Sequence, residues 1–190
     1  ELNVLRIEED KEIYRILSTL TVLVEDHLRE ISINIETMAY YDFLIAKAKL
    51  SKSMDGRSVR FNSRNFINIR GGRHPLIGRS AIPLDFTIGD GYRCLVITGP
   101  NTGGKTVALK TVGLITMMAQ SGMHVPVEEE SEVAVFIDVL ADIGDGQSIE
   151  QSLSTFSSHI RNIISIMECA DPYTLVIMDE VGAGTDPAEG

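Results

Sequence analysis

A glycine-rich loop places the tightest limit on how this chain of 190 residues can fold. The loop, GPNTGGKT, occupies residues 99–106 and follows the apolar run Tyr92–Thr98. It satisfies the pattern G-x-x-x-x-G-K-S/T, in which glycines let successive backbone N–H groups point at one anion. Helix-forming residues follow from about Lys105 to Ser121, and Gly122 is a natural helix stop. The pattern therefore predicts a strand, a phosphate-binding loop and a helix, in that order.

Each residue of this phosphate loop (residues 99–106) has an expected task. Lys105 is expected to span the β- and γ-phosphates of a nucleotide, and the Thr106 hydroxyl to ligate Mg²⁺. The positive end of the following helix favours the same anion. Asn101 and Thr102 are candidates for contact with the γ-phosphate. The expected nucleotide-binding residues are Gly99, Pro100, Asn101, Thr102, Gly103, Gly104, Lys105 and Thr106.

An acidic pair near the end of the sequence supports this reading. The apolar run Leu175–Met178 leads directly into Asp179 and Glu180. Because ligands bind at the carboxyl ends of parallel strands, Asp179 is predicted to hold the metal and Glu180 to activate the attacking water. The two motifs together indicate Mg²⁺-dependent hydrolysis of ATP or GTP. The sequence contains no guanine-reading N-K-x-D element, which favours ATP.

A serine-rich segment, QSLSTFSSH at residues 151–159, starts the helix predicted over Ser154–Ala170. A helix start of this kind binds an anion through its free N–H groups and a serine hydroxyl. In a dimer the anion would be the γ-phosphate held by the other subunit. The alternative is ordinary N-capping by Ser152 or Ser154, which the spacing alone favours.

The chain divides into two regions of different character. Apolar residues recur at helical spacing from Glu8 to about Met54, where Gly and Pro are absent, which predicts one bent helix or two in tandem. The β-branched stretch at residues 31–37 is the candidate junction. From Asp55 onward, short strands alternate with helices, and the last strand covers residues 173–180. The predicted fold is α/β, with a helical segment at 1–54 and a domain with a buried parallel sheet at 55–190.

Composition restricts the partners of this segment. The net charge of −10 argues against a general nucleic-acid grip, which needs clustered Lys and Arg. The acidic turn Glu128–Glu130 is expected to be a solvated loop. Cys94 and Cys169 stand in apolar runs and are expected to be buried thiols in a reducing cytoplasm. No apolar run is long enough to cross a membrane, so no membrane association is expected.

Four stretches of this sequence resemble the ATPase domain of the MutS family, within the ABC-type ATPases. They are GRHPLI, TGPNTGGKT, STFSSH and LVIMDEVGAGTDP, and their wording is most similar to the second bacterial branch of the family. The resemblance covers about residues 8–190 and is strongest from Gly71 onward. It implies a P-loop sheet with flanking helices, and it identifies residues 1–54 as the end of the lever and core helices that link DNA-binding parts to the ATPase.

The resemblance also implies an assembly and a function. ATPase domains of the family form homodimers, in which Ser154 would reach the partner's nucleotide and Gly182, Gly184 and Thr185 would lie at the interface. His74 and His159 are expected to be structural. The implied activity is Mg²⁺-dependent ATP hydrolysis that serves binding of branched or mismatched DNA, in DNA repair or in suppression of recombination. An ABC-type ATPase acting on stalled or collided ribosomes is the alternative.

The sequence departs from the family pattern at its end. The family's ATPase domain continues beyond the position of Gly190, and the chain also lacks an initiator Met. This segment is therefore expected to be truncated, to bind nucleotide weakly and to hydrolyse it poorly or not at all, while the full protein does both. No nuclease activity is assigned to these residues.

Overall fold

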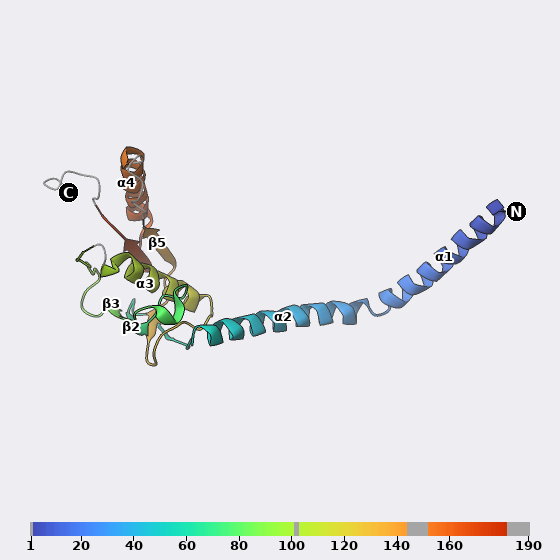
Figure 1. The fold of residues 1–190 in the computed structure, drawn as a ribbon, viewed down its shortest axis with the longest axis horizontal. Coiled ribbons are helices and arrows are strands. Elements are labelled where there is room, and N and C mark those ends of the chain that lie inside the picture. The colour runs from blue at the N-terminus through green and yellow to red at the C-terminus, as the bar shows by residue number, and fades with distance from the viewer. Residues whose placement is uncertain (1, 101–102, 144–151, 182–190) are drawn as a thin grey trace. The chain divides into compact units, whose positions relative to one another are not determined.

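The computed structural model describes residues 2–100, 103–143 and 152–181, with the backbone alone described for 152–158 (Figure 1). The chain separates into two compact units, residues 1–48 and 49–190. The helices are α1 (Leu2–Glu25), α2 (Leu28–Ser53), α3 (Lys105–Gln120) and α4 (Ser152–Cys169), with a short 3-10 turn at Gly78–Ser80. The strands are β1 (Arg60–Asn62), β2 (Ile67–Gly72), β3 (Leu84–Ile88), β4 (Glu132–Ala134), β5 (Asp138–Asp142) and β6 (Thr174–Met178). The predicted α/β class is confirmed.

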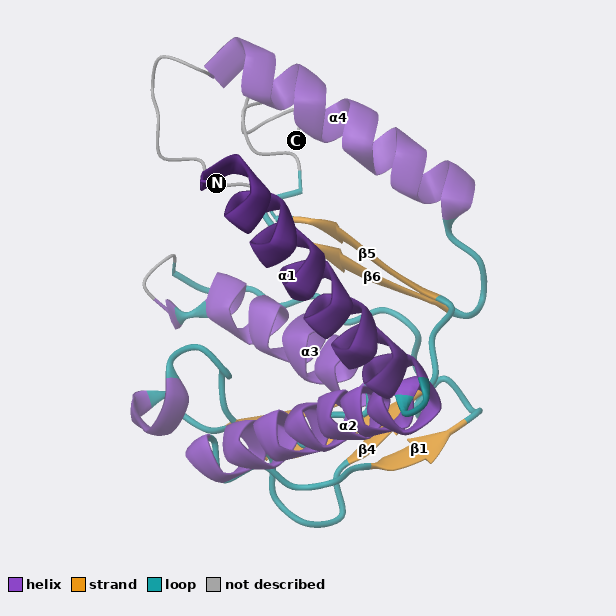
Figure 2. Cartoon of the chain, turned by 90° about the vertical axis from the view of Figure 1, so that its right-hand side faces the viewer, coloured by secondary structure: helices purple, strands orange, loops and turns teal. Residues whose placement is uncertain are grey.

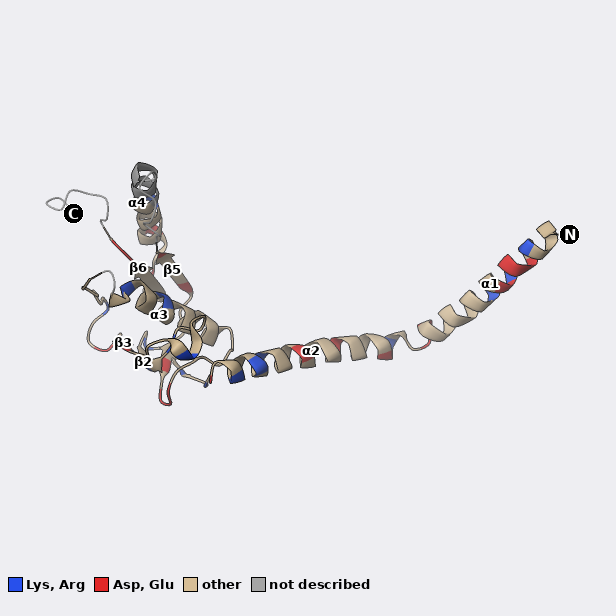
Figure 3. Cartoon of the chain, viewed as in Figure 1, with Lys and Arg blue, Asp and Glu red and all other residues tan. Residues whose placement is uncertain are grey.

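The first unit consists of α1 and most of α2. All described residues from 2 to 46 are exposed, although many are large and apolar. Charged residues are concentrated in the first half of α1, whereas Ile16–Val24 contains none (Figure 3). The helices therefore carry apolar surface that the described residues of this unit leave uncovered. None of the described helices has the length and hydropathy needed to cross a membrane.

Of the two arrangements predicted for this region, one bent helix or two helices in tandem, the structure has the second, but the junction was placed wrongly. The break falls at Asp26 and His27, whereas the β-branched stretch 31–37 lies inside α2. The His27 N–H donates to the Val24 carbonyl, at 3.1 Å, which is the tighter bonding common at the end of a helix. Helix α1 therefore ends just before the polar dipeptide Asp26-His27, where the backbone bonding changes, and the β-branched residues do not interrupt α2.

The described residues of the second unit form two sheets. The larger has the strand order β1-β4-β2-β3, in which β1 and β4 are parallel and the other neighbours are antiparallel. The smaller is the parallel pair β5-β6, and α4 connects its two strands. A buried parallel sheet was predicted for this region; among the described strands, β1-β4 and β5-β6 are parallel, whereas β2 pairs with β3 and with β4 in antiparallel fashion.

Helix α3 lies between the two sheets. An added Cβ at Gly113 would come within 2.8 Å of Ile177 on β6, and one at Gly72 on β2 within 3.2 Å of Ile115. Residues 113 and 115 are about 200° apart around a helix, so α3 contacts the two sheets through opposite faces. Ile67, Ile69, Ile115, Val125 and Val133 are fully buried in this core. Figure 2 shows α4, the β5-β6 pair and α3 in successive layers.

The strand predicted over Tyr92–Thr98 is absent from the structure. These residues form no strand, and Leu95 and Val96 are 42% and 77% exposed. An apolar run becomes a strand only where a neighbour completes its hydrogen bonds, and none of the described strands pairs with this one. The prediction of buried thiols is also wrong, since Cys94 and Cys169 are both exposed. Cys94 lies in the segment that forms no strand, and Cys169 is the last residue of α4.

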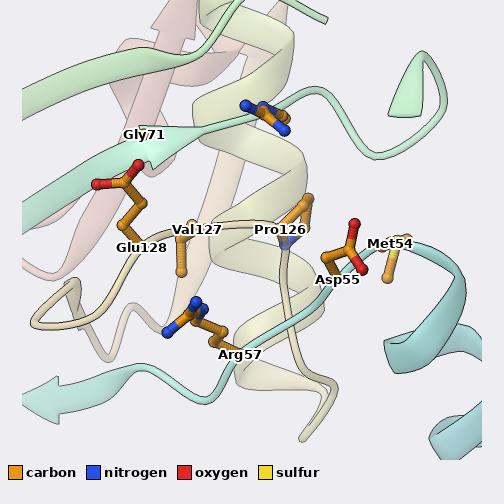
Figure 4. Close-up of a pocket in the computed structure, with 8 residues that line it drawn as sticks. Met54, Asp55, Arg57, Gly71, Pro126, Val127 and Glu128 are labelled. Carbon is orange, nitrogen blue, oxygen red and sulfur yellow. The ribbon is translucent and has the colours of Figure 1, made fainter. Parts of the chain in front are cut away.

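The acidic turn at residues 128–130 is exposed, as predicted, but it is not simply solvated. Glu129 pairs with Arg57, and Glu130 pairs with Arg70 at 2.5 Å. A pocket of about 180 Å³ lies beside this turn, with Glu128 opposite Gly71 and with Arg57 and Asp55 along its wall (Figure 4). It contains no residue of the phosphate loop, so it is not part of the predicted nucleotide site.

Candidate nucleotide site

The described part of the phosphate loop curls back on itself. Gly99 has φ 145° and Gly104 has φ 77°, and an added Cβ would meet nothing within 4 Å at either position. The Gly103 N–H donates to the Pro100 carbonyl at 2.9 Å. Both positive φ values are accessible to glycine at little cost, which is why this segment can turn so tightly before α3. Asn101 and Thr102 lie outside the described residues.

Lys105 stands at the first position of α3 and reaches back across the loop. Its Nζ donates to the Gly99 carbonyl at 2.6 Å. The helix starts at Gly104 without a side-chain cap, so its first N–H groups face the loop. A lysine ammonium and the positive end of a helix therefore meet at one place, which is the arrangement that favours a phosphate group.

Thr106 and Asp179, from the two predicted motifs, are in contact. The Thr106 hydroxyl donates to Oδ2 of Asp179, although the residues are 73 positions apart in the sequence. Asp179 follows β6 and is 8% exposed, and its Oδ1 accepts the Glu180 N–H at 3.0 Å. The hydroxyl and the carboxylate are oxygen ligands of the kind that Mg²⁺ takes, and they fit a Mg²⁺-phosphate site in which the remaining ligands come from phosphate and water.

Within the described residues, no group of three or more His, Cys, Asp or Glu side chains could hold a metal. A Mg²⁺ ion bound together with a nucleotide needs only one or two protein carboxylates, so this observation agrees with the small donor set of Thr106 and Asp179.

Glu180 lies just outside this contact. It is exposed and has φ 49°, so the chain turns at this residue instead of continuing the strand. The extended backbone expected at this position is therefore not present. Ser154 has no described side chain, although it lies in the first turn of α4. Gly182, Gly184 and Thr185 lie outside the described residues.

The two histidines expected to be structural make local contacts. His74 is 9% exposed, and its carbonyl accepts the N–H groups of Ile77 and Gly78, as in a turn. His159 on α4 faces Asp142 of β5, with Nδ1 3.0 Å from Oδ2. Neither histidine contacts a described residue of the phosphate loop in the bonds that the structure shows.

The family model described as MutS domain V matches residues 95–190, which is just over half of the chain and contains both motifs. The chain belongs to the MutS family. Three curated relatives named Endonuclease MutS2 are similar along its whole length. They come from Halalkalibacterium halodurans (53% identical), Halothermothrix orenii (52%) and Lachnoclostridium phytofermentans (53%). The chain spans 24% of the length of each relative. The resemblance to the second MutS branch is thereby confirmed.

Sequence reasoning missed one buried carboxylate of this MutS domain. Asp142 is 6% exposed and lies at the carboxyl end of β5, beside the end of β6. Its carbonyl accepts the Asp179 N–H at 2.9 Å. The signal was present in the sequence, because each of two apolar runs ends in an aspartate, VLAD and VIMD, and parallel strands bring such ends together.

Proposed function

We propose that residues 55–190 form the ATP-binding and ATP-hydrolysing domain of a MutS-type DNA-binding protein, with an ABC-type P-loop sheet. We also propose that residues 1–54 form its helical lever segment. The contact between Thr106 and Asp179 carries this proposal, because it joins the phosphate loop to the acidic motif across 73 positions of sequence. The match to MutS domain V over both motifs supports it.

In this proposal each residue has one task. The N–H groups of the loop at residues 99–104 and the start of α3 bind the phosphates, and Lys105 neutralises their charge. Thr106 and Asp179 hold Mg²⁺, which would stabilise the charge that develops on the phosphate oxygens. Glu180 accepts a proton from the attacking water. Its position at a turn directly after β6 places it next to Asp179, whose Oδ1 accepts its N–H.

When a nucleotide binds, Lys105 must give up its bond to the Gly99 carbonyl in order to reach a phosphate. Its ammonium group lies against the Gly99 carbonyl, and a phosphate would attract it more strongly because the phosphate is charged. The loop can therefore be held closed by its own lysine until a nucleotide takes over that bond.

The proposed protein works as a homodimer in the cytoplasm. Ser154, at the start of α4, completes the partner's site, and Gly182, Gly184 and Thr185 line the interface. DNA, branched or mismatched, binds mainly through parts of the protein other than this segment, since the segment carries a net charge of −10. The name of the relatives, Endonuclease MutS2, includes an endonuclease activity. We assign none of it to these residues, because their motifs are those of a nucleotide site.

The direct test is ATP hydrolysis by the full-length protein, since the chain spans only 24% of its relatives' length. Glu180→Gln is expected to keep Mg²⁺-ATP binding and to lose turnover by at least about a hundredfold, as removal of a general base does. Lys105→Ala is expected to lose binding itself. Glu168→Gln, an exposed glutamate on α4, is the matched control and should behave as wild type.

Unchanged turnover in Glu180→Gln would contradict the catalytic role, and unchanged binding in Lys105→Ala would contradict the site. The same protein should bind branched DNA in an ATP-dependent manner. Titration with stalled ribosomes under the same conditions separates the DNA function from the alternative named above.

A further inference from the structure

Asp142 joins β5 to the residue proposed to hold the metal. In the parallel pair it lies opposite Met178, the last residue of β6. Its carbonyl accepts the N–H of Asp179 at 2.9 Å, and Asp179 in turn contacts Thr106 on α3. The backbone of Asp142 is therefore one hydrogen bond away from the proposed Mg²⁺ ligand.

The side chain of Asp142 points to a different element. Its carboxylate lies 3.0 and 3.2 Å from Nδ1 of His159, and Oδ1 accepts a hydrogen bond from Nδ2 of Asn162 at 2.8 Å. His159 and Asn162 both belong to α4 and are three residues apart, so they share one face of that helix. The three residues are called the Asp142 cluster below.

A buried carboxylate is costly unless it is fully paired, and here α4 supplies both partners. Apolar contacts alone would hold α4 on the sheet without fixing its rotation or its axial position. Charge-assisted bonds are directional, so two bonding side chains one turn apart fix both. The Asp142 cluster therefore fixes the position of α4 along the sheet, and with it the position of the start of α4 relative to Asp179.

We propose that Asp142 is a positioning residue for catalysis in the partner subunit. Through His159 and Asn162 it fixes α4, whose first turn carries Ser154, in register with its own subunit's Asp179. Contacts then run without interruption from Thr106 through Asp179 and Asp142 to α4. This inference rests on the proposed function, in which the start of α4 completes the partner's nucleotide site.

The first test is steady-state hydrolysis by full-length homodimers. Asp142→Leu is expected to lower kcat by about ten- to a hundredfold, the cost of a displacement of about 1 Å in a catalytic group, while Mg²⁺-ATP affinity is kept. Asp142→Asn keeps one acceptor oxygen and should retain an intermediate rate. Asp138→Leu is the matched control, because Asp138 is exposed at the other end of the same strand.

The decisive test uses mixed dimers that contain one Lys105→Ala subunit, which cannot hold nucleotide. When that subunit is paired with an Asp142→Leu subunit, only the Asp142→Leu subunit binds nucleotide. This nucleotide faces the α4 of the Lys105→Ala subunit, in which the Asp142 cluster is intact. Activity should then equal that of the reference dimer of Lys105→Ala with wild type. When one subunit carries both substitutions and its partner is wild type, activity should fall as in the Asp142→Leu homodimer.

The reverse pattern, with loss only when Asp142→Leu and the bound nucleotide share a subunit, would overturn the proposal in favour of a local role beside Asp179. Equal activity in every dimer would also overturn it. Nucleotide binding by the Asp142→Leu subunit in the first dimer reports that this subunit is folded, and if it fails, Asp142→Asn takes its place. A wild-type protein without ATP hydrolysis would instead refute the proposed function, so the two failures are distinguishable.

Discussion

At the scale of single residues, the contact between Thr106 and Asp179 is the most informative feature of this MutS chain. A hydroxyl and a carboxylate from distant motifs meet beside the start of α3. Sequence motifs predicted both residues because the chemistry of a Mg²⁺-phosphate site restricts which side chains can serve. Asp142 belongs to no such motif. Its signal in the sequence was only an aspartate at the end of an apolar run, which is common, and its side-chain partners lie on another element.

Removing the Thr106 hydroxyl tests its role as a metal ligand. Thr106→Val keeps the shape of the side chain, so the phosphate loop should still fold. The dependence of ATP affinity on Mg²⁺ should then become weaker, because one of the two protein ligands is gone and Asp179 remains. Calorimetry of full-length protein with ATP, in Mg²⁺ and in a chelator, measures this. Thr111→Val, on the same helix, should leave the Mg²⁺ effect intact, and an intact effect in Thr106→Val would contradict the assignment.

Gln120 shows how one side chain holds α3 to the neighbouring backbone. Its amide oxygen accepts the Phe136 N–H at 2.7 Å, and its amide nitrogen donates to the Phe136 carbonyl at 3.0 Å. Gln120→Leu would leave both groups of a buried residue unpaired, at a cost of about 2 kcal/mol. The expected result is faster amide exchange at Phe136 and a lower urea midpoint. Unchanged exchange at Phe136 would show that the bonds are not formed in solution.

At the scale of elements, α3 determines how the second unit is assembled. It begins at the phosphate loop and is buried between two sheets, where Gly113 faces Ile177 and Ile115 approaches Gly72. Leu at position 113 would overpack this contact, and the expected destabilisation is about 1–3 kcal/mol. Gly113→Ala should cost less, because Ala gains about 1 kcal/mol in helix propensity over Gly.

Thermal or urea unfolding of the two Gly113 variants measures this difference. Met117→Leu is the matched control, since Met117 lies on the same helix and is 52% exposed. A Gly113→Leu variant as stable as wild type would mean that α3 is not packed against β6 as described.

The elements that sequence reasoning predicted best are those with their own periodicity or stop signal. Helix α3 ends just before Gly122, which has φ 73°, and α4 begins two residues before the predicted start. The prediction of a strand over Tyr92–Thr98 was wrong, because strand formation depends on neighbouring strands that no local sequence pattern reveals. The predicted position of the break between α1 and α2 was wrong, because the break lies at Asp26 and His27, where no Gly or Pro marks it in the sequence.

At the scale of the whole molecule, the net charge supports a division in which this segment binds nucleotide and other parts of the protein bind DNA. The chain carries 27 acidic and 17 basic residues, and three arginines are already paired with Glu129, Glu130 and Glu132. Phosphate-backbone binding needs unpaired cations in a cluster. The isolated 190-residue chain is therefore expected to show no binding of branched DNA at physiological salt, whereas the full-length protein is expected to bind it. Fluorescence anisotropy measures both, and tight binding by the isolated chain would contradict this division.

The central claim is that the loop at residues 99–106 binds the phosphates of Mg²⁺-ATP, and calorimetry on the full-length protein tests it most directly. Wild type and Lys110→Ala, a lysine five residues further along α3, are predicted to bind Mg²⁺-ATP with equal affinity, while Lys105→Ala shows no measurable heat of binding. Equal affinity in all three proteins, or no binding in wild type, would contradict the account.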